Sequence, residues 1–316
     1  MIGRDSRFEI TFTVLSFWII IGAYIDSWAH HHGQTESFFS PWHIPLYSGF
    51  FATWFYLFLT IFWNGWQWKR SLPRGYWFSF LGCIVFFAGG LGDMVWHLVF
   101  GVEASIEALL SPTHLLLALG TGMIVSGPLR AAFSRYGYPM GLREWVPALS
   151  SATLLLSILT FMTEYANPLT HIMAASKDFS SLALGTAGII LYSIFFSGFI
   201  LVLATRWKLP FGSVTFILLI NSVLMSFLHG TYQMVIVGFF SGLASDYLYQ
   251  QLRPARDTYE FRLFSFIVPS VFFAFYFAAL FATLGVAWSV HAWAGSIALA
   301  GIAGLLASYA ILQPGR

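Results

Sequence analysis

Carboxylate and imidazole side chains are concentrated in residues 26–43. Asp26 and His30 are four residues apart, and Glu36 precedes His43 by seven residues. On a helix, side chains four positions apart share one face, so Asp26 and His30 can act on the same ligand. One carboxylate and two imidazoles leave open positions on a divalent ion, as in non-haem iron sites, and imidazole also suits copper and zinc. The stretch therefore predicts a transition-metal site with Asp26, His30 and His43 as ligands.

The same pattern occurs a second time. Asp93 and His97 are again four residues apart, and Glu107 precedes His114 by seven. In both copies a Ser-Pro pair begins three residues before the last histidine. Polar residues gather at helix ends wherever the membrane interface is wet, but the doubled spacing favours ligands. We predict that Asp93, His97 and His114 also bind metal, in a second site or in one binuclear site shared with the first set.

Other ionisable residues are candidates for supporting roles. An ionisable group inside a membrane is a functional candidate by default, so His229, in an apolar stretch, is a further predicted metal ligand. Glu164 and His171 are seven residues apart and echo the repeat imperfectly. Three glutamates near the ligands are predicted catalytic residues that carry protons, with ligation or hydrogen bonding to the histidines as alternatives: Glu36, Glu103 and Glu107.

The composition of the chain predicts a membrane protein. Of 316 residues, 58% are hydrophobic, 19% aromatic and 9% charged, which is too little charge for a water-exposed surface. The net charge of +2 gives no sign of nucleic acid as a partner. The single cysteine, Cys83, excludes a disulfide within the chain and a thiolate cluster. We expect the first apolar segment, which follows Arg4 and Arg7, to span the membrane and not to be a cleaved signal peptide.

The apolar stretches predict an all-α integral membrane protein, a bundle of eight or nine transmembrane helices in one polytopic domain, residues 1–316. Several stretches reach the ~20 residues that a span needs. A polar loop is expected at about 241–262. The repeat predicts that helices 1–2 (about 8–67) superimpose on helices 3–4 (about 75–133) as a parallel repeat. The expected spans are 8–29, 43–67, 75–100, 112–133, 145–165, 181–205, 211–239, 263–285 and, as a ninth span or hairpin partner, 288–312.

Charge predicts the orientation. Basic residues gather in the N-terminal segment and in alternate turns, while the ligand stretches lie in the other turns. By the positive-inside rule we expect the plasma (inner) membrane, with the N-terminus cytoplasmic and the metal-rich face outside. The basic residues that carry this prediction are Arg4, Arg7, Lys69, Arg70, Arg74, Arg130, Arg135, Arg143, Arg206 and Lys208.

The first ligand stretch resembles a known site. Asp26-x3-His30-x12-His43 is similar in spacing and placement to the Asp/His/His metal site in the C subunit of copper membrane monooxygenases. The resemblance covers residues 26–43 and implies a metal ion held between the end of one membrane helix and the start of the next. The second copy departs from it, with sixteen residues between His97 and His114.

Three functions remain open. The first is copper- or iron-dependent oxidation of a small apolar substrate, by this chain or by a complex of which it is a subunit. Phe38, Phe39, Trp42, Trp96 and Phe100 would provide an aromatic environment for a substrate that arrives from lipid. Candidate partners are therefore the lipid bilayer, an apolar substrate, and membrane subunits or further copies of this chain.

The second function is a metal or cation transporter or a metal-handling protein, in which the acids and histidines capture a cation. The expected helix interiors offer few polar residues for a path across the membrane, chiefly Asn221 and Cys83. The third is a zinc-dependent membrane hydrolase, with Glu36 or Glu107 as base. Haem ligation by paired histidines lacks a supporting spacing. The predicted cofactor is a transition metal ion, copper or iron before zinc.

Overall fold

All regular secondary structure described in the computed structural model is helical. The description covers residues 2–33, 40–65, 71–101, 106–135 and 140–312. Within these residues, seven helices are long and apolar enough to cross a membrane, or up to eight if the bent pair Pro112–Val125 and Gly127–Ser134 counts as one span. The chain divides into two compact units, Met1–Ile158 and Leu159–Arg316. The predicted all-helical fold with long apolar spans is confirmed.

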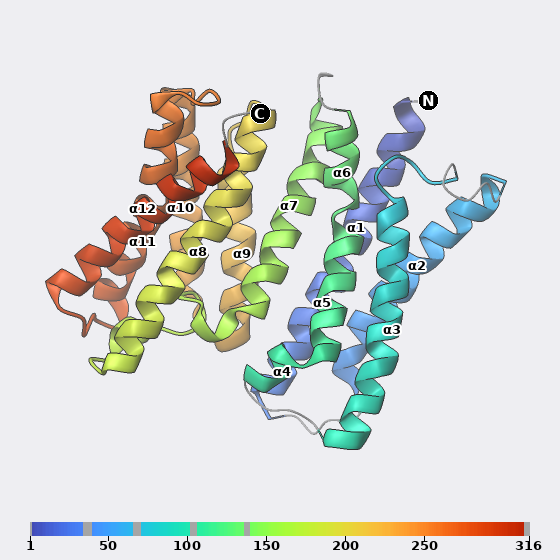
Figure 1. Cartoon of the computed structure of the whole chain (residues 1–316), viewed down its shortest axis with the longest axis horizontal. Helices are drawn as coiled ribbons and strands as arrows, with labels where there is room; N and C mark the ends of the chain where they lie inside the picture. The colour runs from blue at the N-terminus through green and yellow to red at the C-terminus, as the bar shows by residue number, and fades with distance from the viewer. Residues whose placement is uncertain (1, 34–39, 66–70, 102–105, 136–139, 313–316) are drawn as a thin grey trace. The chain divides into compact units, whose positions relative to one another are not determined.

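The first unit is built from two helical hairpins. In the first hairpin α1 packs against α2, and in the second α3 packs against α5. The C-terminal ends of α1 and α3 lie at the same end of the unit (Figure 1). The helices of this unit are α1 (Ile2–His31), α2 (Ile44–Trp63), α3 (Trp77–Phe100), α4 (Ile106–Leu110), α5 (Pro112–Val125), α6 (Gly127–Ser134) and α7 (Leu142–Met162), with a 3-10 turn η1 (Pro41–His43) before α2. α7 continues past the boundary of the unit at Ile158.

Glycines set the close approach of the helices in both hairpins. A Cβ on Gly22 would lie 2.5 Å from the backbone nitrogen of Leu46, and one on Gly89 would lie 3.1 Å from that of Leu117. Each glycine stands one helical turn before the aspartate of its ligand set, and each leucine follows the last histidine of the set by three residues. The two hairpins therefore pack at corresponding positions, close to the ligands.

Two arginine side chains make contacts between elements at the opposite end of the first unit. Glu9, which is 2% exposed, pairs with Arg135 at 2.8 Å and joins α1 to the residue that follows α6. The guanidinium of Arg130 donates a hydrogen bond to the backbone carbonyl of Gly75. The first contact ties α1 to the end of α6, and the second ties the segment before α3 to α6, both at the end of the unit that lacks the histidines.

The expected 112–133 span is broken. α5 and α6 differ in direction by 42° at Ser126, which caps α6 ahead of Pro128. Proline has no N–H to continue the α-helical ladder and its ring crowds the preceding turn, so a bend at this position has a direct cause.

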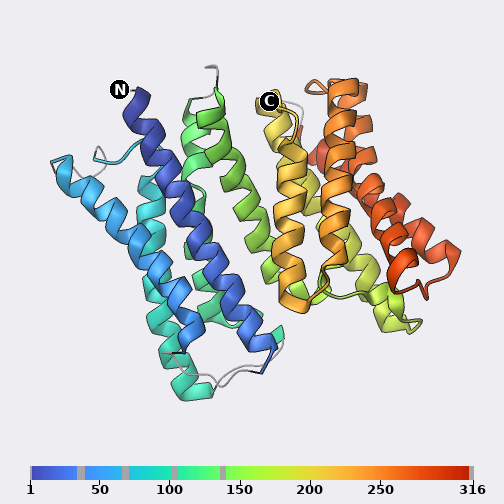
Figure 2. The ribbon, with the colours of Figure 1, turned by 180° about the vertical axis from the view of Figure 1, so that it is seen from behind.

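The second unit consists of five long helices that follow two 3-10 turns. α8 packs against α12, α12 against α11, α11 against α10, and α10 against α9. Seen from behind, α9 and α10 run side by side (Figure 2). The elements are η3 (Glu164–Ala166), η4 (Met173–Ala175), α8 (Phe179–Arg206), α9 (Ser213–His229), α10 (Gln233–Leu252), α11 (Tyr259–Thr283) and α12 (Val290–Ile311).

The prediction of one helix at 211–239 and a polar loop at 241–262 is wrong. α9 ends at His229 because Gly230 adopts a left-handed conformation, and α10 then continues to Leu252. Asp246, read as a loop residue from its charge, is 1% exposed within α10. Its carboxylate accepts hydrogen bonds from the backbone N–H groups of Val214 and Thr215, at 3.0 and 2.9 Å, and so satisfies the first turn of α9.

The last two helices, α11 and α12, pack closely against each other, as expected of a hairpin partner at 288–312. A Cβ on Gly304 of α12 would collide with the backbone oxygen of Ser265 in α11. A Cβ on Gly301 would collide with the side chain of Ser270. Small residues let two helix backbones approach closely where lipid surrounds them.

The close approach of α3 and α5 can be tested with two glycines. A Cβ on Gly120 would lie 2.6 Å from the backbone nitrogen of Phe86, whereas one on Gly90 meets no atom within 4 Å. We expect Gly120→Ala to lower the free energy of unfolding by about 1–3 kcal/mol through overpacking. The control Gly90→Ala should leave it unchanged or raise it by up to about 1 kcal/mol. Thermal unfolding of both variants in one detergent measures this, and equal stability would contradict the packing described.

Candidate metal centres

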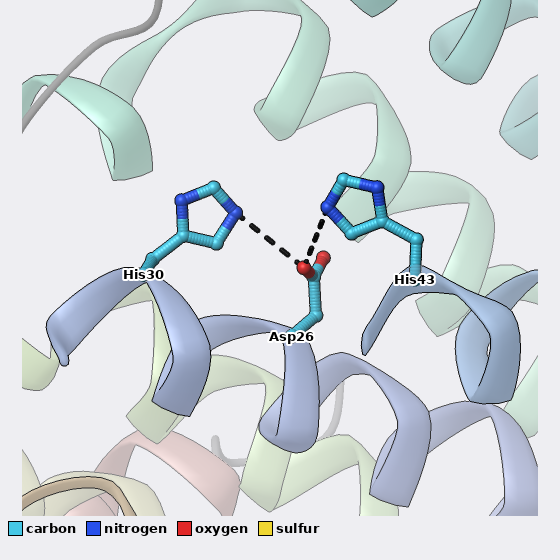
Figure 3. A group of neighbouring side chains, drawn as sticks. All are labelled: Asp26, His30 and His43. Atoms are coloured by element: carbon cyan, nitrogen blue, oxygen red, sulfur yellow. Dashed lines mark ion pairs between the residues drawn. The ribbon is translucent and has the colours of Figure 1, made fainter. Parts of the chain in front are cut away.

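The first predicted ligand set comes together. Nε2 of His30 lies 3.4 Å from Oδ1 of Asp26, and Nε2 of His43 lies 2.9 Å from the same oxygen. Figure 3 shows both rings turned toward the carboxylate between them. The ring centroids of the two histidines are 6.1 Å apart, with 24° between the ring planes. All three side chains are half-buried.

Local structure explains this convergence. Asp26 and His30 occupy successive turns at the end of α1, so they share a face. Ser40 precedes the 3-10 turn Pro41–His43, and this turn places His43 at the N-cap of α2. Proline suits this place because its missing N–H has no partner at a helix start. His43 is the least exposed of the three side chains, at 12%.

The second set repeats the arrangement. Nε2 of His97 lies 3.2 Å from Oδ2 of Asp93, and Nε2 of His114 lies 3.6 Å from Oδ1. Asp93 and His97 lie near the end of α3, and His114 lies in the first turn of α5. Ser111 caps α5 by accepting a hydrogen bond from the backbone N–H of His114, and its hydroxyl lies 2.7 Å from Nδ1 of the same residue.

The hydrogen bonds of His97 fix which ring nitrogen faces the carboxylate. Nδ1 of His97 lies 3.3 Å from the backbone carbonyl of Gly101, which can only accept, so Nδ1 carries the proton. A neutral His97 then presents the lone pair of Nε2 to an oxygen of Asp93. Two lone pairs at this distance repel unless a proton or a metal ion lies between them. The ring is thus oriented as in metal sites where a carbonyl holds the far nitrogen.

The spacing of the donor atoms fits a metal ion. Ligands bound at about 2.0–2.1 Å lie about 2.9 Å apart when they meet at right angles and about 3.4 Å apart at the tetrahedral angle. The four Nε2–Oδ distances run from 2.9 to 3.6 Å. In each set one ligand atom per residue can be chosen so that all three lie within 4.8 Å of one another. The residues form two three-ligand sets, Asp26/His30/His43 and Asp93/His97/His114.

The remaining predicted site residues lie apart from these sets. Glu107 is exposed on α4 and belongs to neither three-ligand set, although its backbone carbonyl accepts the N–H of Ser111. Glu36 and Glu103 lie outside the described residues. His229 ends α9 in the second unit, where its ring lies 4.6 Å from that of His171.

Two residues next to the ligands were not identified from the sequence. The hydroxyl of Thr113 donates a 2.8 Å hydrogen bond to Oδ1 of Asp93. Trp42 holds the corresponding place before His43, so the first set lacks this donor. Tyr47 stands one turn after His43, with its hydroxyl 3.5 Å from Nδ1 of that ring. The sequence carries a signal for each of them. Thr113 directly precedes His114, and Tyr47 follows His43 by four residues, which places it one helical turn away.

Comparison of the chain with protein families, with curated proteins and with solved structures finds no match. The likeness of residues 26–43 to the C subunit of copper membrane monooxygenases stays a prediction. The structural fact that bears on it is the convergence of Asp26, His30 and His43.

Metal content tests the two sets. We expect His43→Ala and His114→Ala each to lower the bound metal by one ion per chain, because each removes one of the three ligands that its set has among the described residues. The matched control is His32→Ala, since His32 is exposed just past the end of α1 and lies in neither set. Elemental analysis of purified protein gives the count. Unchanged content in both ligand variants would leave these histidines as hydrogen-bonding residues of the interface.

The hydroxyl of Thr113 gives a finer test. Thr113→Val keeps the shape of the side chain but removes the hydrogen bond to Asp93, and loss of such a supporting bond lowers metal affinity by about 10–100-fold. We expect this loss in the second set only. Thr121→Val is the control, because that hydroxyl bonds to the backbone of its own helix at Leu117. Competition titration with a chelator measures both affinities, and equal affinities would contradict the role of Thr113.

Proposed function

We propose that this chain is an integral membrane protein whose two helical hairpins each hold one transition metal ion, and that these ions support oxidation of a small, poorly polar substrate. The observation that carries the proposal is the same Asp/His/His set assembled twice, with three protein ligands in each set. Three ligands leave open coordination positions for a substrate or oxidant. Copper and iron are favoured over zinc because the proposed reaction moves electrons.

The internal repeat is part of the proposal. In both hairpins the aspartate and first histidine end one helix, and a Ser-Pro pair leads to the second histidine at the start of the next. In both, a glycine one turn before the aspartate packs against a leucine three residues after the last histidine. These correspondences support a parallel structural repeat, with units of about 8–67 and 75–133.

Charge supports the proposed orientation within each unit. In the first unit Arg74, Arg130 and Arg143 lie at the end without histidines. In the second, the additional helix α10 brings Arg253 and Arg256 to the end where α8 stops at Arg206. The positive-inside rule then supports a cytoplasmic N-terminus and a metal face outside the plasma membrane.

Apolar side chains beside the second ligand set support an apolar substrate. Leu98, Val99 and Phe100 follow His97 directly and are 80%, 64% and 69% exposed. Trp96 packs against Phe100, with ring centroids 4.5 Å apart. Apolar groups exposed beside polar ligands offer a route from the lipid to the metal. Phe38 and Phe39, predicted to contribute to this environment, lie outside the described residues.

The chemistry proposed is a monooxygenation with dioxygen as the oxidant. Dioxygen takes up two electrons and two protons; one oxygen atom enters a substrate C–H bond and the other leaves as water. A bound copper or iron ion would supply the redox chemistry. The aspartates and histidines would hold this ion. Glu36, Glu103 and Glu107 would carry protons, and a membrane partner subunit would supply the electrons.

The two residues that were the chief candidates for an ion path, Asn221 and Cys83, do not support a transporter. The amide of Asn221 donates to Thr160 at 2.8 Å and its oxygen accepts from Tyr192 at 3.0 Å, both within the second unit. Cys83 is fully buried in the first unit, in the same cluster as Phe86 and Ile124. Both residues therefore have packing roles, and neither marks a path for an ion.

Activity measured with isotopic oxygen tests the function. Protein in membrane vesicles, given a reductant, ¹⁸O-labelled dioxygen and a panel of small hydrocarbons, should incorporate ¹⁸O into product. His43→Ala and His114→Ala should lower the rate at least in proportion to the metal they lose, while His32→Ala should not. Metal flux into sealed vesicles that disappears in the same variants, without ¹⁸O incorporation, would overturn the proposal in favour of transport. A zinc-loaded protein that is indifferent to oxygen and reductant would indicate hydrolysis.

A further inference from the structure

The two hairpins of the first unit differ at one position beside their ligand sets. In the first hairpin Tyr47 follows His43 by four residues, and in the second Ala118 follows His114 by four residues. A phenol can release an electron together with a proton, whereas the methyl group of alanine does not. The first set therefore has a side chain for redox chemistry at a position that alanine occupies in the second.

The side chain of Tyr47 lies against a ligand of the first set. Its hydroxyl is 3.5 Å from Nδ1 of His43, and the centroids of the two rings are 5.6 Å apart. Nε2 of the same imidazole faces Asp26 at 2.9 Å. When Nε2 binds a metal ion, Nδ1 carries the ring proton and the oxygen of Tyr47 is an acceptor for it. One imidazole ring thus separates the phenol from the proposed ion.

The second set also lies close to this phenol. The carboxylates of Asp26 and Asp93 both interact electrostatically with Tyr47. Asp26 belongs to the same hairpin as Tyr47, whereas Asp93 belongs to the other hairpin. Coulomb interactions weaken with distance, so both carboxylates are near neighbours of the phenol. Tyr47 is therefore a residue that the two ligand sets have in common.

Packing between the hairpins holds Tyr47 in this place. Leu46 and Phe50, on either side of it in α2, pack into an apolar cluster that also includes Phe86 of α3 and Leu117 of α5. The rings of Phe50 and Phe86 are stacked, with centroids 4.6 Å apart and 26° between their planes. The two hairpins therefore share a core beside Tyr47, and this core fixes the position of the phenol relative to both sets.

The proposed oxidation needs more electrons than one ion supplies in a single one-electron step. Dioxygen takes up two electrons when one of its atoms enters the substrate and the other leaves as water. Each hairpin has one three-ligand set among the described residues, which suits one ion. An ion that changes its charge by one gives one electron, so a second donor must act near the same ion. The phenol of Tyr47, one imidazole away, is placed to be this donor.

We propose that Tyr47 is a redox-active residue that relays one electron from the ion of the second set to the ion of the first. This inference rests on the proposed function, because it assigns the source of one of the two electrons that the oxidation consumes. Tyr47 also positions His43 by accepting its Nδ1–H.

The relay has two balanced steps. In the first, the O–H bond of Tyr47 breaks; its electron passes through the imidazole of His43 and reduces the oxidised ion of the first set, and its proton passes to water. In the second, the ion held by Asp93, His97 and His114 gives one electron to the phenoxyl group, and a proton from water re-forms the O–H bond. The partner subunit then reduces both ions again.

A tyrosyl radical is the readout, because it has a sharp optical absorption band that the phenol lacks. Protein loaded with copper(I) is mixed with dioxygen in a stopped-flow instrument, without added reductant. In His114→Ala protein the second ion is absent and cannot return an electron, so we expect the radical to accumulate. Adding Tyr47→Phe should abolish it. Tyr56→Phe is the matched control, since Tyr56 is also half-buried on α2 but packs against Phe8.

Copper content is measured in every variant, so that loss of the radical is not confused with loss of the ion. Should Tyr47→Phe not fold, Tyr47→Leu takes its place. The proposal is overturned if copper-loaded His114→Ala protein forms no radical, or if the radical is as large with Tyr47→Phe as with Tyr56→Phe. Failure of the proposed function would appear differently, as wild-type protein that incorporates no ¹⁸O. Failure of the relay alone would leave ¹⁸O incorporation equal in Tyr47→Phe and Tyr56→Phe.

Discussion

A carboxylate that is largely removed from water is the constraint on which this structure depends. Water cannot solvate such a group fully, so the carboxylate must face cations or hydrogen-bond donors. Asp26 and Asp93 each meet two imidazoles at Nε2–Oδ distances of 2.9–3.6 Å. Buried Glu164 lies near His229, and buried Glu9 pairs with Arg135. The ends of both units are therefore organised around acids whose charge is balanced locally.

Helix packing determines whether these partners can meet. The first two ligands of each hairpin set lie on one helix and the third on the next, so the separation of the two helices sets the distance between them. Gly22 and Gly89 allow that separation to be small one turn away from the ligands. In the second set Thr113 adds a hydroxyl to the carboxylate and Ser111 holds the far nitrogen of His114. Backbone approach and hydrogen bonding together give the donor atoms a spacing suited to a metal ion.

The sequence predicted what depends on local spacing. Asp26 with His30 and Asp93 with His97 were expected on one helical face, and helices were expected to start close after both Ser-Pro pairs, at about 43 and 112; both are found. The sequence did not predict the features that depend on contacts between residues far apart in the chain. The charge of Asp246 suggested a loop, so α10 was not predicted. In the structure this carboxylate accepts hydrogen bonds from N–H groups at the start of α9, and this explains an acid inside a buried helix. The bend at Ser126 and the bond from Thr113 to Asp93 also depend on contacts that no short pattern contains.

The central claim is that each Asp/His/His set is a metal site, and diffraction at a metal absorption edge tests it most directly. Crystals of the purified protein, measured above and below the copper, iron and zinc edges, should show two anomalous peaks in the first unit. One should lie among Asp26, His30 and His43 and the other among Asp93, His97 and His114, with nitrogen ligands at about 2.0–2.1 Å for zinc. Ordered side chains at both places without a peak at any edge, joined directly by hydrogen bonds, would contradict the claim.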